Sequence, residues 1–215
     1  MPCAPRTLRV TLAFAIALVP LSSPAETTTG TNTTYAHAMR SINPRLRDAQ
    51  SRAYAEALLS NSQRMHLDPR LVMAVVTAES SWNVYAVSPD GAEGLGQFKP
   101  ETARELGVST FSGRSNLRGV TIYLHQLLGM FKSSRNAMRL AIASYNAGPY
   151  AIRANGGAPR GETQRYVTRV MALWHDFKKR LSPQPAVAEV AEILTTPQAV
   201  MQDENAYWGD PPLSR

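Results

Sequence analysis

The spacing of apolar positions after Asp68 predicts an α-helix with one strongly apolar face. Val72, Val75 and Val76 lie at i, i+3 and i+4, so they share that face. Asp68 predicts the start of the helix, because a carboxylate at the N-cap accepts backbone N–H groups and the proline that follows needs no hydrogen bond. Glu79 completes the i+7 position, so the pattern places a carboxylic acid on an apolar face.

An ionised Glu79 would be costly at this position. Burial removes its hydration and therefore favours the protonated form, which raises the pKa. The negative end of the helix dipole, near the C-terminus of the helix, acts in the same direction. A glutamic acid that is still protonated near neutral pH can serve as a general acid. Periodicity alone leaves one alternative open, a glutamate at a frayed helix end that faces solvent or pairs with an arginine.

The rest of the chain shows helical patterns and no convincing strand or internal repeat. Helices are predicted over residues 45–66, 100–106, 116–131, 138–145 and 162–179. Between them, turn residues and clustered glycines predict loops over residues 87–96 and 150–161. The fold class expected from these patterns is mainly α, with a single domain over residues 45–182.

The N-terminus has the pattern of an export signal over residues 1–25. Arg6 and Arg9 precede an apolar run at residues 10–19, and small residues up to Ala25 offer a cleavage site. The run is too short to span a membrane comfortably, so we expect a cleaved signal rather than a retained anchor. This predicts a periplasmic protein with no integral membrane span in the mature chain.

Neither flank of the predicted domain has a strong apolar pattern, although a weak apolar helix is possible over residues 186–194. Residues 26–44 are rich in threonine and asparagine and are expected to form a flexible leader. Residues 183–215 are acidic and punctuated by proline, and are expected to form a mostly disordered tail.

Charge and composition exclude several classes of function. The formal charge of +7 is uneven, since residues 51–181 carry 17 Lys and Arg against 9 Asp and Glu, while residues 182–215 carry one Arg against five acids. A basic domain favours anionic surfaces or an acidic polymer. The chain has no basic stripe interleaved with aromatic residues, so nucleic-acid binding is not predicted. Cys3, the one cysteine, precedes the expected cleavage site, so thiol chemistry is not expected. No residues have metal-ligand spacing, and no cofactor is predicted.

Three separated motifs, with two supporting stretches, carry a resemblance to a known family. They are Glu79-Ser80, the Gly94-Leu95-Gly96-Gln97 run, the run Ser144-Tyr145-Asn146-Ala147-Gly148, the helix NLRGVTIYL from Asn116, and Glu162-Thr163 with Tyr166-Val167. In this order they resemble the soluble lytic transglycosylase (SLT) domain, of the glycoside hydrolase family 23 type. The resemblance covers roughly residues 51–180 and implies a lysozyme-like α-helical fold.

Three positions depart from the family's usual pattern. Gly96 stands where the family usually has methionine, and Ser144 stands where it usually has alanine. Glu93 adds a charge to a loop position that is often apolar or basic. Because neither Gly96 nor Ser144 carries the proton chemistry, we expect these two departures to affect the flexibility of the loop and its saccharide contacts.

The resemblance implies an enzyme that cleaves the β-1,4 bond between N-acetylmuramic acid and N-acetylglucosamine in peptidoglycan. In this family one carboxylic acid is sufficient. Glu79 would protonate the leaving oxygen and then take the proton of the muramic C6 hydroxyl, which attacks C1 and closes a 1,6-anhydro ring without consuming water.

The resemblance also implies the residues that would bind the glycan. Ser80 would orient the site, Gln97 would position the glycan together with backbone groups of Gly94 and Leu95, and Tyr145, Asn146 and Tyr166 would surround the reacting sugar. For the two tyrosines the alternative is a structural role in the core with satisfied hydroxyls.

Two other functions stay open at this point. A hydrolase that resembles goose lysozyme would use water and a second carboxylate, for which the candidates are Asp90, Glu93, Glu101 and Glu162. A non-catalytic scaffold module would keep the fold and bind peptidoglycan. The expected partners are peptidoglycan strands, in general wall turnover or beside a secretion or conjugation apparatus of the cell envelope.

Overall fold

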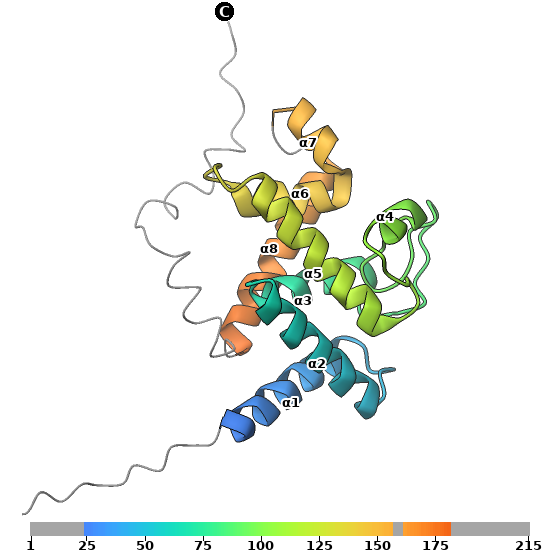
Figure 1. The fold of residues 1–215 in the computed structure, drawn as a ribbon, viewed down its shortest axis with the longest axis vertical. Helices are drawn as coiled ribbons and strands as arrows, with labels where there is room; N and C mark the ends of the chain where they lie inside the picture. The colour runs from blue at the N-terminus through green and yellow to red at the C-terminus, as the bar shows by residue number, and fades with distance from the viewer. Residues whose placement is uncertain (1–23, 157–160, 182–215) are drawn as a thin grey trace, which may run out of the picture.

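The apolar pattern after Asp68 forms α3 (Pro69–Ser80), the helix against which α2, α5 and α8 pack. The computed structural model describes residues 24–156 and 161–181. The other helices within these residues are α1 (Pro24–Ile42), α2 (Asp48–Arg64), α4 (Pro100–Glu105), α5 (Gly113–Met130), α6 (Ala137–Ala147), α7 (Pro149–Ala154) and α8 (Glu162–Arg180). The described residues contain no strand, only two isolated bridges, which confirms the mainly α class. In Figure 1, α5 crosses the middle of the molecule, with α1 and α2 below it and α6 and α7 above.

The first residues of α3 are held by the predicted cap. The Asp68 carboxylate accepts the backbone N–H of Arg70 at 2.9 Å and its guanidinium at 2.7 Å. The indole N–H of Trp174 on α8 donates to the same carboxylate at 2.9 Å. Because Arg70 is buried and also donates to the carbonyl of Leu181, this cluster joins the start of α3 to α8. Residues 69–77 are buried on all sides, as expected of a helix at the centre of a domain.

The flexible leader expected over residues 26–44 is wrong for the described part of α1. Tyr35, Ala36 and Met39 are at most 3 % exposed and belong to the core. Arg40 pairs with Asp48 at 3.0 Å, which joins α1 to the first turn of α2. The sequence pattern missed this helix because three residues are buried in the part of it whose side chains are described, and their burial depends on the partner helix rather than on local propensity. The expected cleavage site at Ala25 falls in the first turn of α1.

The structure corrects one further expectation from the sequence, and two others concern residues outside the described ranges. The loop expected over residues 150–161 begins instead as α7, where Pro149 occupies the first turn and Ile152 is buried. The apolar run of the export signal and the acidic tail at 183–215 lie outside the described residues. None of the helices in the described ranges is long and apolar enough to cross a membrane.

The glycine-rich loop after α3 is tightly folded. Ser81 and Trp82 adopt left-handed backbone conformations, with φ of 47° and 65°, and end the helix. Further along, Glu93 exchanges two backbone hydrogen bonds with Phe98, at 2.9 and 3.0 Å, which closes the turn between them. Gly94 has φ of +77°, and a Cβ there would lie 2.0 Å from the carbonyl oxygen of Thr110, so this position requires glycine.

Candidate functional site

Glu79 lies in the last turn of α3, where the helix meets the glycine-rich loop. The Tyr166 hydroxyl, from the N-terminal part of α8, donates a hydrogen bond of 2.6 Å to Glu79 Oε1. Burial raises the pKa of Glu79 to about 7, while the Tyr166 hydrogen bond and the charge of Arg169 act in the opposite direction. A substantial fraction of Glu79 is therefore protonated near neutral pH.

The tyrosines around Glu79 remain hydrogen-bond donors. Burial raises the pKa of both Tyr145 and Tyr166 well above the usual range, and the nearby Glu79 charge adds to the shift. The Tyr145 hydroxyl donates to the carbonyl of Gly96 at 2.9 Å rather than to Glu79. Tyr145 therefore holds the loop, and Tyr166 holds the acid. Both tyrosines therefore have the structural role that the sequence left open, with hydroxyls that are hydrogen-bonded within the protein.

A cavity of about 340 Å³ opens beside Glu79. Four of the residues predicted from sequence line it, namely Glu79, Gln97, Tyr145 and Asn146. Asn146 lies at the end of α6, and its side-chain oxygen accepts the hydroxyl hydrogen of Thr163 at 2.9 Å, so its amide N–H₂ is the donor available to a ligand. The cavity thus combines an acid with amide donors and aromatic rings, a composition that suits a polar, ring-containing ligand.

Gln97 has two functions in the loop. Its side-chain amide donates to the carbonyls of Ala86 at 3.1 Å and of Gly94 at 3.0 Å. Its backbone φ is 50°, a left-handed conformation that is uncommon for glutamine. These two hydrogen bonds hold the side chain of Gln97 against the loop, and Gln97 lines the cavity.

The other predicted binding residues support the loop from behind. The Ser80 hydroxyl donates to the carbonyl of Leu95 at 2.9 Å, which joins the end of α3 to the loop. The Leu95 side chain is fully buried, and Gly94 packs against Thr110. Ser80, Gly94 and Leu95 are absent from the residues that line this cavity, and so is Tyr166. These residues therefore hold the loop and Glu79 in position.

The departures from the family pattern have physical explanations in two cases. Gly96 lies so close to α5 that a Cβ would meet Val120 at 2.4 Å and the Tyr145 hydroxyl at 2.8 Å. Its N–H donates to the side-chain oxygen of Asn116 at 2.7 Å. Glu93 accepts the hydroxyl hydrogen of Thr110 at 2.7 Å, so its charge fixes one loop to the next. The buried Ser144 hydroxyl has no hydrogen-bond partner among the described residues, and nothing in the structure explains it.

Sequence reasoning missed Tyr123 on α5. Its ring lies 5.3 Å from the Tyr145 ring, centroid to centroid, and Tyr123 lines the same cavity as Glu79. The stretch NLRGVTIYL contains this tyrosine, and its place three residues after the buried Val120 was the available signal. Lys99 also lines the cavity and had not been singled out.

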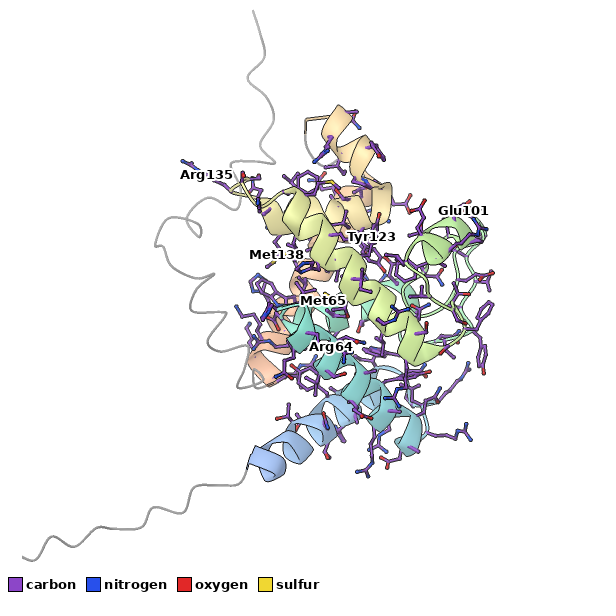
Figure 2. All side chains as sticks on the ribbon, in the orientation of Figure 1. Arg64, Met65, Glu101, Tyr123, Arg135 and Met138 are labelled. Carbon is purple, nitrogen blue, oxygen red and sulfur yellow. The ribbon has the colours of Figure 1, made fainter. Side chains whose placement is uncertain are left out.

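The four candidate second carboxylates differ in where they lie relative to the Glu79 cavity. Asp90 lines the same cavity as Glu79. Glu93 is engaged with Thr110, Glu162 is exposed in the first turn of α8, and Glu101 is exposed on α4 at the outer edge of the molecule (Figure 2). Within the described ranges, no group of three His, Cys, Asp or Glu residues could hold a metal ion.

Comparisons with known proteins agree with the resemblance. Residues 56–167, just over half of the chain, match the model of the Transglycosylase SLT domain. A protein of Enterobacteria phage PRD1 named transglycosylase is 35 % identical over 117 residues, which cover 54 % of this chain and 41 % of that protein. The membrane-bound lytic murein transglycosylase F of Idiomarina loihiensis is 36 % identical over 123 residues, 54 % of this chain and 25 % of that protein. This chain therefore spans less than half the length of these relatives.

A solved structure shares the fold. It is an inactive Glu-to-Gln mutant of the lytic transglycosylase Slt of Pseudomonas aeruginosa, which superimposes with a TM-score of 0.53 at 28 % identity over 71 % of this chain and 29 % of that one. The motifs, the helical fold around Glu79 and the family match lead to one conclusion: the chain belongs to the Transglycosylase SLT domain family.

Proposed function

We propose that this protein is a peptidoglycan lytic transglycosylase, which cleaves the β-1,4 bond between N-acetylmuramic acid and N-acetylglucosamine. The observation that supports this most strongly is Glu79, a largely buried acid with a pKa of about 7 at the edge of a cavity. Relatives named as lytic murein transglycosylases and the solved relative, in which a glutamate-to-glutamine mutant is inactive, support the same chemistry.

In this mechanism Glu79 acts twice. Tyr166 donates to Oε1, so Oε2 is the oxygen that holds the proton. Glu79 transfers that proton to the glycosidic oxygen as the bond from this oxygen to C1 of muramic acid breaks. The C6 hydroxyl oxygen then bonds to C1 and closes the 1,6-anhydro ring, and its proton passes to Glu79. The acid is restored, no water is consumed, and one group serves both steps.

The surrounding residues would bind and orient the sugar. We assign the Gln97 side chain and the Asn146 amide to the hydroxyl and N-acetyl groups, and the Tyr145 ring to one side of the reacting sugar. Ser80, with the backbone of Gly94 and Leu95, holds the loop that presents Gln97. Tyr166 would hold Glu79 in position and lower its pKa through the hydrogen bond to Oε1.

Mass analysis of the products tests this proposal. Purified peptidoglycan is digested with the full chain and with Glu79→Gln, and the released fragments are weighed. Fragments lighter by the mass of one water than the reducing sugars, made by the wild-type chain and absent with Glu79→Gln, are the expected result. Equal release by the variant would contradict the assignment of the acid.

Hydrolysis is the second candidate function, and the position of Asp90 is the observation that favours it. Asp90 lines the Glu79 cavity and could activate a water as the second carboxylate of a lysozyme-like hydrolase. Reducing ends among the products, lost with Asp90→Asn, would establish this function. A scaffold module would bind the sacculus and release nothing.

The cellular role forms part of the proposal. We infer export to the periplasm through residues 1–25, and action in wall turnover or in local opening of the wall for a secretion or conjugation apparatus. Co-purification with the full chain and with a chain ending at residue 182 tests the role of the acidic tail. Identical partner sets would exclude the tail from partner binding.

A further inference from the structure

A second cavity, of about 630 Å³, adjoins the C-terminal end of α3 on the side of α1 and α2. One wall is the turn between α1 and α2, residues 42–46, and the other is the segment that follows α3, residues 80–85. Ser80 lines this cavity, while Glu79 lines the first one. Two consecutive residues at the end of one helix therefore border two cavities.

The first wall lies outside the match to the family. The matched region begins at residue 56, whereas this wall comes from residues 42–46 and from Gln50. The turn is fixed in place, because Asn43 donates its N–H to the carbonyl of Met39 at 2.9 Å and Leu46 is buried in the core. One wall of the cavity is therefore built by an N-terminal element outside the matched region, and the other wall lies within it.

The lining of this cavity combines apolar side chains with side chains that offer hydrogen-bond donors. The side-chain oxygen of Asn43 accepts the N–H of Arg45, and that of Asn83 accepts the N–H of Tyr85, both at 3.1 Å. Each asparagine has thus used its oxygen on the backbone, so its N–H₂ group is what it offers to a ligand. Arg45 adds an exposed guanidinium with five further donors.

The charge in the lining of this cavity is positive. Among the described residues, Arg45 is the one charged side chain in its lining, and no Asp or Glu contributes to it. Gln50 donates its side-chain N–H to the Tyr54 hydroxyl at 3.0 Å, which leaves its oxygen as an acceptor for an N–H group. A guanidinium, amide donors and one acceptor match a peptide that carries carboxylates, because guanidinium pairs with carboxylate and amides pair with peptide groups.

We propose that this second cavity binds the acidic peptide stem of peptidoglycan through its carboxylates. The assignment rests on the proposed function, which places the glycan at Glu79. The stem is attached to the lactyl group of muramic acid, so a muramyl unit held beside Glu79 presents its peptide next to the reacting sugar. Ser80, which follows Glu79 in the chain, lines the same cavity as Arg45.

Binding of a free stem peptide tests the cavity independently of catalysis. A synthetic stem tetrapeptide, and the same peptide with its carboxyl groups amidated, are titrated into the full chain by NMR. The acidic peptide is expected to shift resonances of residues 43–46 and 82–85 and to bind about tenfold more tightly than the amidated one. The Arg45→Gln variant is expected to bind both peptides equally. Shifts elsewhere, or no binding at millimolar peptide, would overturn the proposal.

Cleavage assays then show whether the peptide matters to the reaction. Glycan strands that carry peptides are compared with strands stripped by an amidase. Arg45→Gln is expected to raise KM about tenfold on peptide-bearing strands, to leave kcat within about twofold, and to leave stripped strands unaffected. Arg47→Gln, an exposed arginine outside the lining, is the matched control and should change neither substrate.

The outcomes separate the two proposals. An equal rise in KM on both substrates would mean that the cavity holds sugar rather than peptide, and an unchanged KM on both would remove it from substrate binding; either result overturns the assignment. A wild-type chain that releases no product from either substrate contradicts the proposed function instead, and the NMR titration still decides whether the cavity binds an acidic peptide.

Discussion

The Tyr166 hydroxyl donates to Glu79 Oε1 over 2.6 Å, and this bond joins residues that lie 87 positions apart in the chain. It favours the ionised form of Glu79, while burial favours the protonated form by a larger amount, so the net effect is a pKa of about 7. Tyr166 thus lowers the fraction of Glu79 that is protonated at neutral pH, in addition to holding its position.

Tyr166→Phe is expected to move the pH profile of the enzyme. Loss of the hydroxyl removes a hydrogen bond to the carboxylate, so the pKa of Glu79 is expected to rise from its value of about 7. The descending limb of kcat/KM, which reports loss of the proton from the free enzyme, should shift to higher pH. Tyr123→Phe is the control, because Tyr123 lines the cavity without contributing to the pKa of Glu79. The same shift in both variants would contradict the role of Tyr166.

Glu79→Gln should change the dependence of stability on pH. The folded-state pKa lies above the ordinary value of 4.5, so between pH 4.5 and 7 the native state binds more protons than the unfolded state. Stability therefore falls as the pH rises through this window, by up to about 3 kcal/mol. The glutamine variant lacks this loss and should gain stability over the wild type at pH 8 relative to pH 4. Denaturant unfolding at both pH values measures the difference, and parallel pH dependence of the two proteins would rule it out.

Gly96→Ala should disturb the loop that carries Gln97. A Cβ at this position would meet Val120 and the Tyr145 hydroxyl at distances no real Cβ adopts, so the loop or α5 must shift. Overpacking of this kind costs about 1–3 kcal/mol, and displacement of Gln97 should lower activity as well. Gly129→Ala is the matched control, because a Cβ there meets nothing within 4 Å. Thermal unfolding and glycan cleavage check both effects, and a Gly96→Ala protein that resembles the control would contradict the close packing.

Ser144→Ala should be neutral or stabilising. The buried hydroxyl lacks a partner among the described residues, and such a group costs about 1–3 kcal/mol relative to a satisfied one. Ser51→Ala provides the contrast, since the equally buried Ser51 hydroxyl donates to the carbonyl of Asp48 at 2.9 Å, and its loss should destabilise the fold. Chemical denaturation of the two variants measures the difference. A clear loss of stability in Ser144→Ala would indicate that this hydroxyl has a partner.

Asp68→Ala should destabilise the fold strongly. The change leaves Arg70 buried without its carboxylate and removes the acceptor of the Trp174 indole N–H. Breaking a buried pair of this kind costs about 3–5 kcal/mol. Asp48→Ala removes an ion-pair partner whose side chain is 47 % exposed, and should cost no more than about 1 kcal/mol. Comparable unfolding midpoints for the two variants would contradict the role of Asp68 in joining α3 to α8.

The accuracy of the sequence predictions depended on how local the determining interactions are. The cap at Asp68 and the apolar face of α3 are set by residues within one or two turns, and these predictions are confirmed. The described part of α1 was missed because the burial of Tyr35 and Met39 depends on its packing against α2. The predicted cleavage site at Ala25 stays a prediction.

The candidate site was predictable as a set of residues but not as an arrangement. The motifs placed Glu79, Gln97, Tyr145 and Asn146 in one site, and the structure shows them around one cavity. They could not show that Ser80 and Leu95 bond to each other behind the cavity, or that Tyr123 lines it. Spacing along the chain says which residues belong together, while the direction of each side chain follows from packing.

The sequence by itself determined a mainly α domain of the SLT type with an acid on an apolar helix face. That conclusion needed only periodicity, caps and ordered motifs, which are local properties of the chain. The tertiary structure alone decided that Tyr166 bonds to Glu79, that Gly96 has no room for a side chain, and that the turn at 43–46 forms a wall of a second cavity. These features bring together residues distant in the chain, and packing the helices into one core fixes their distances.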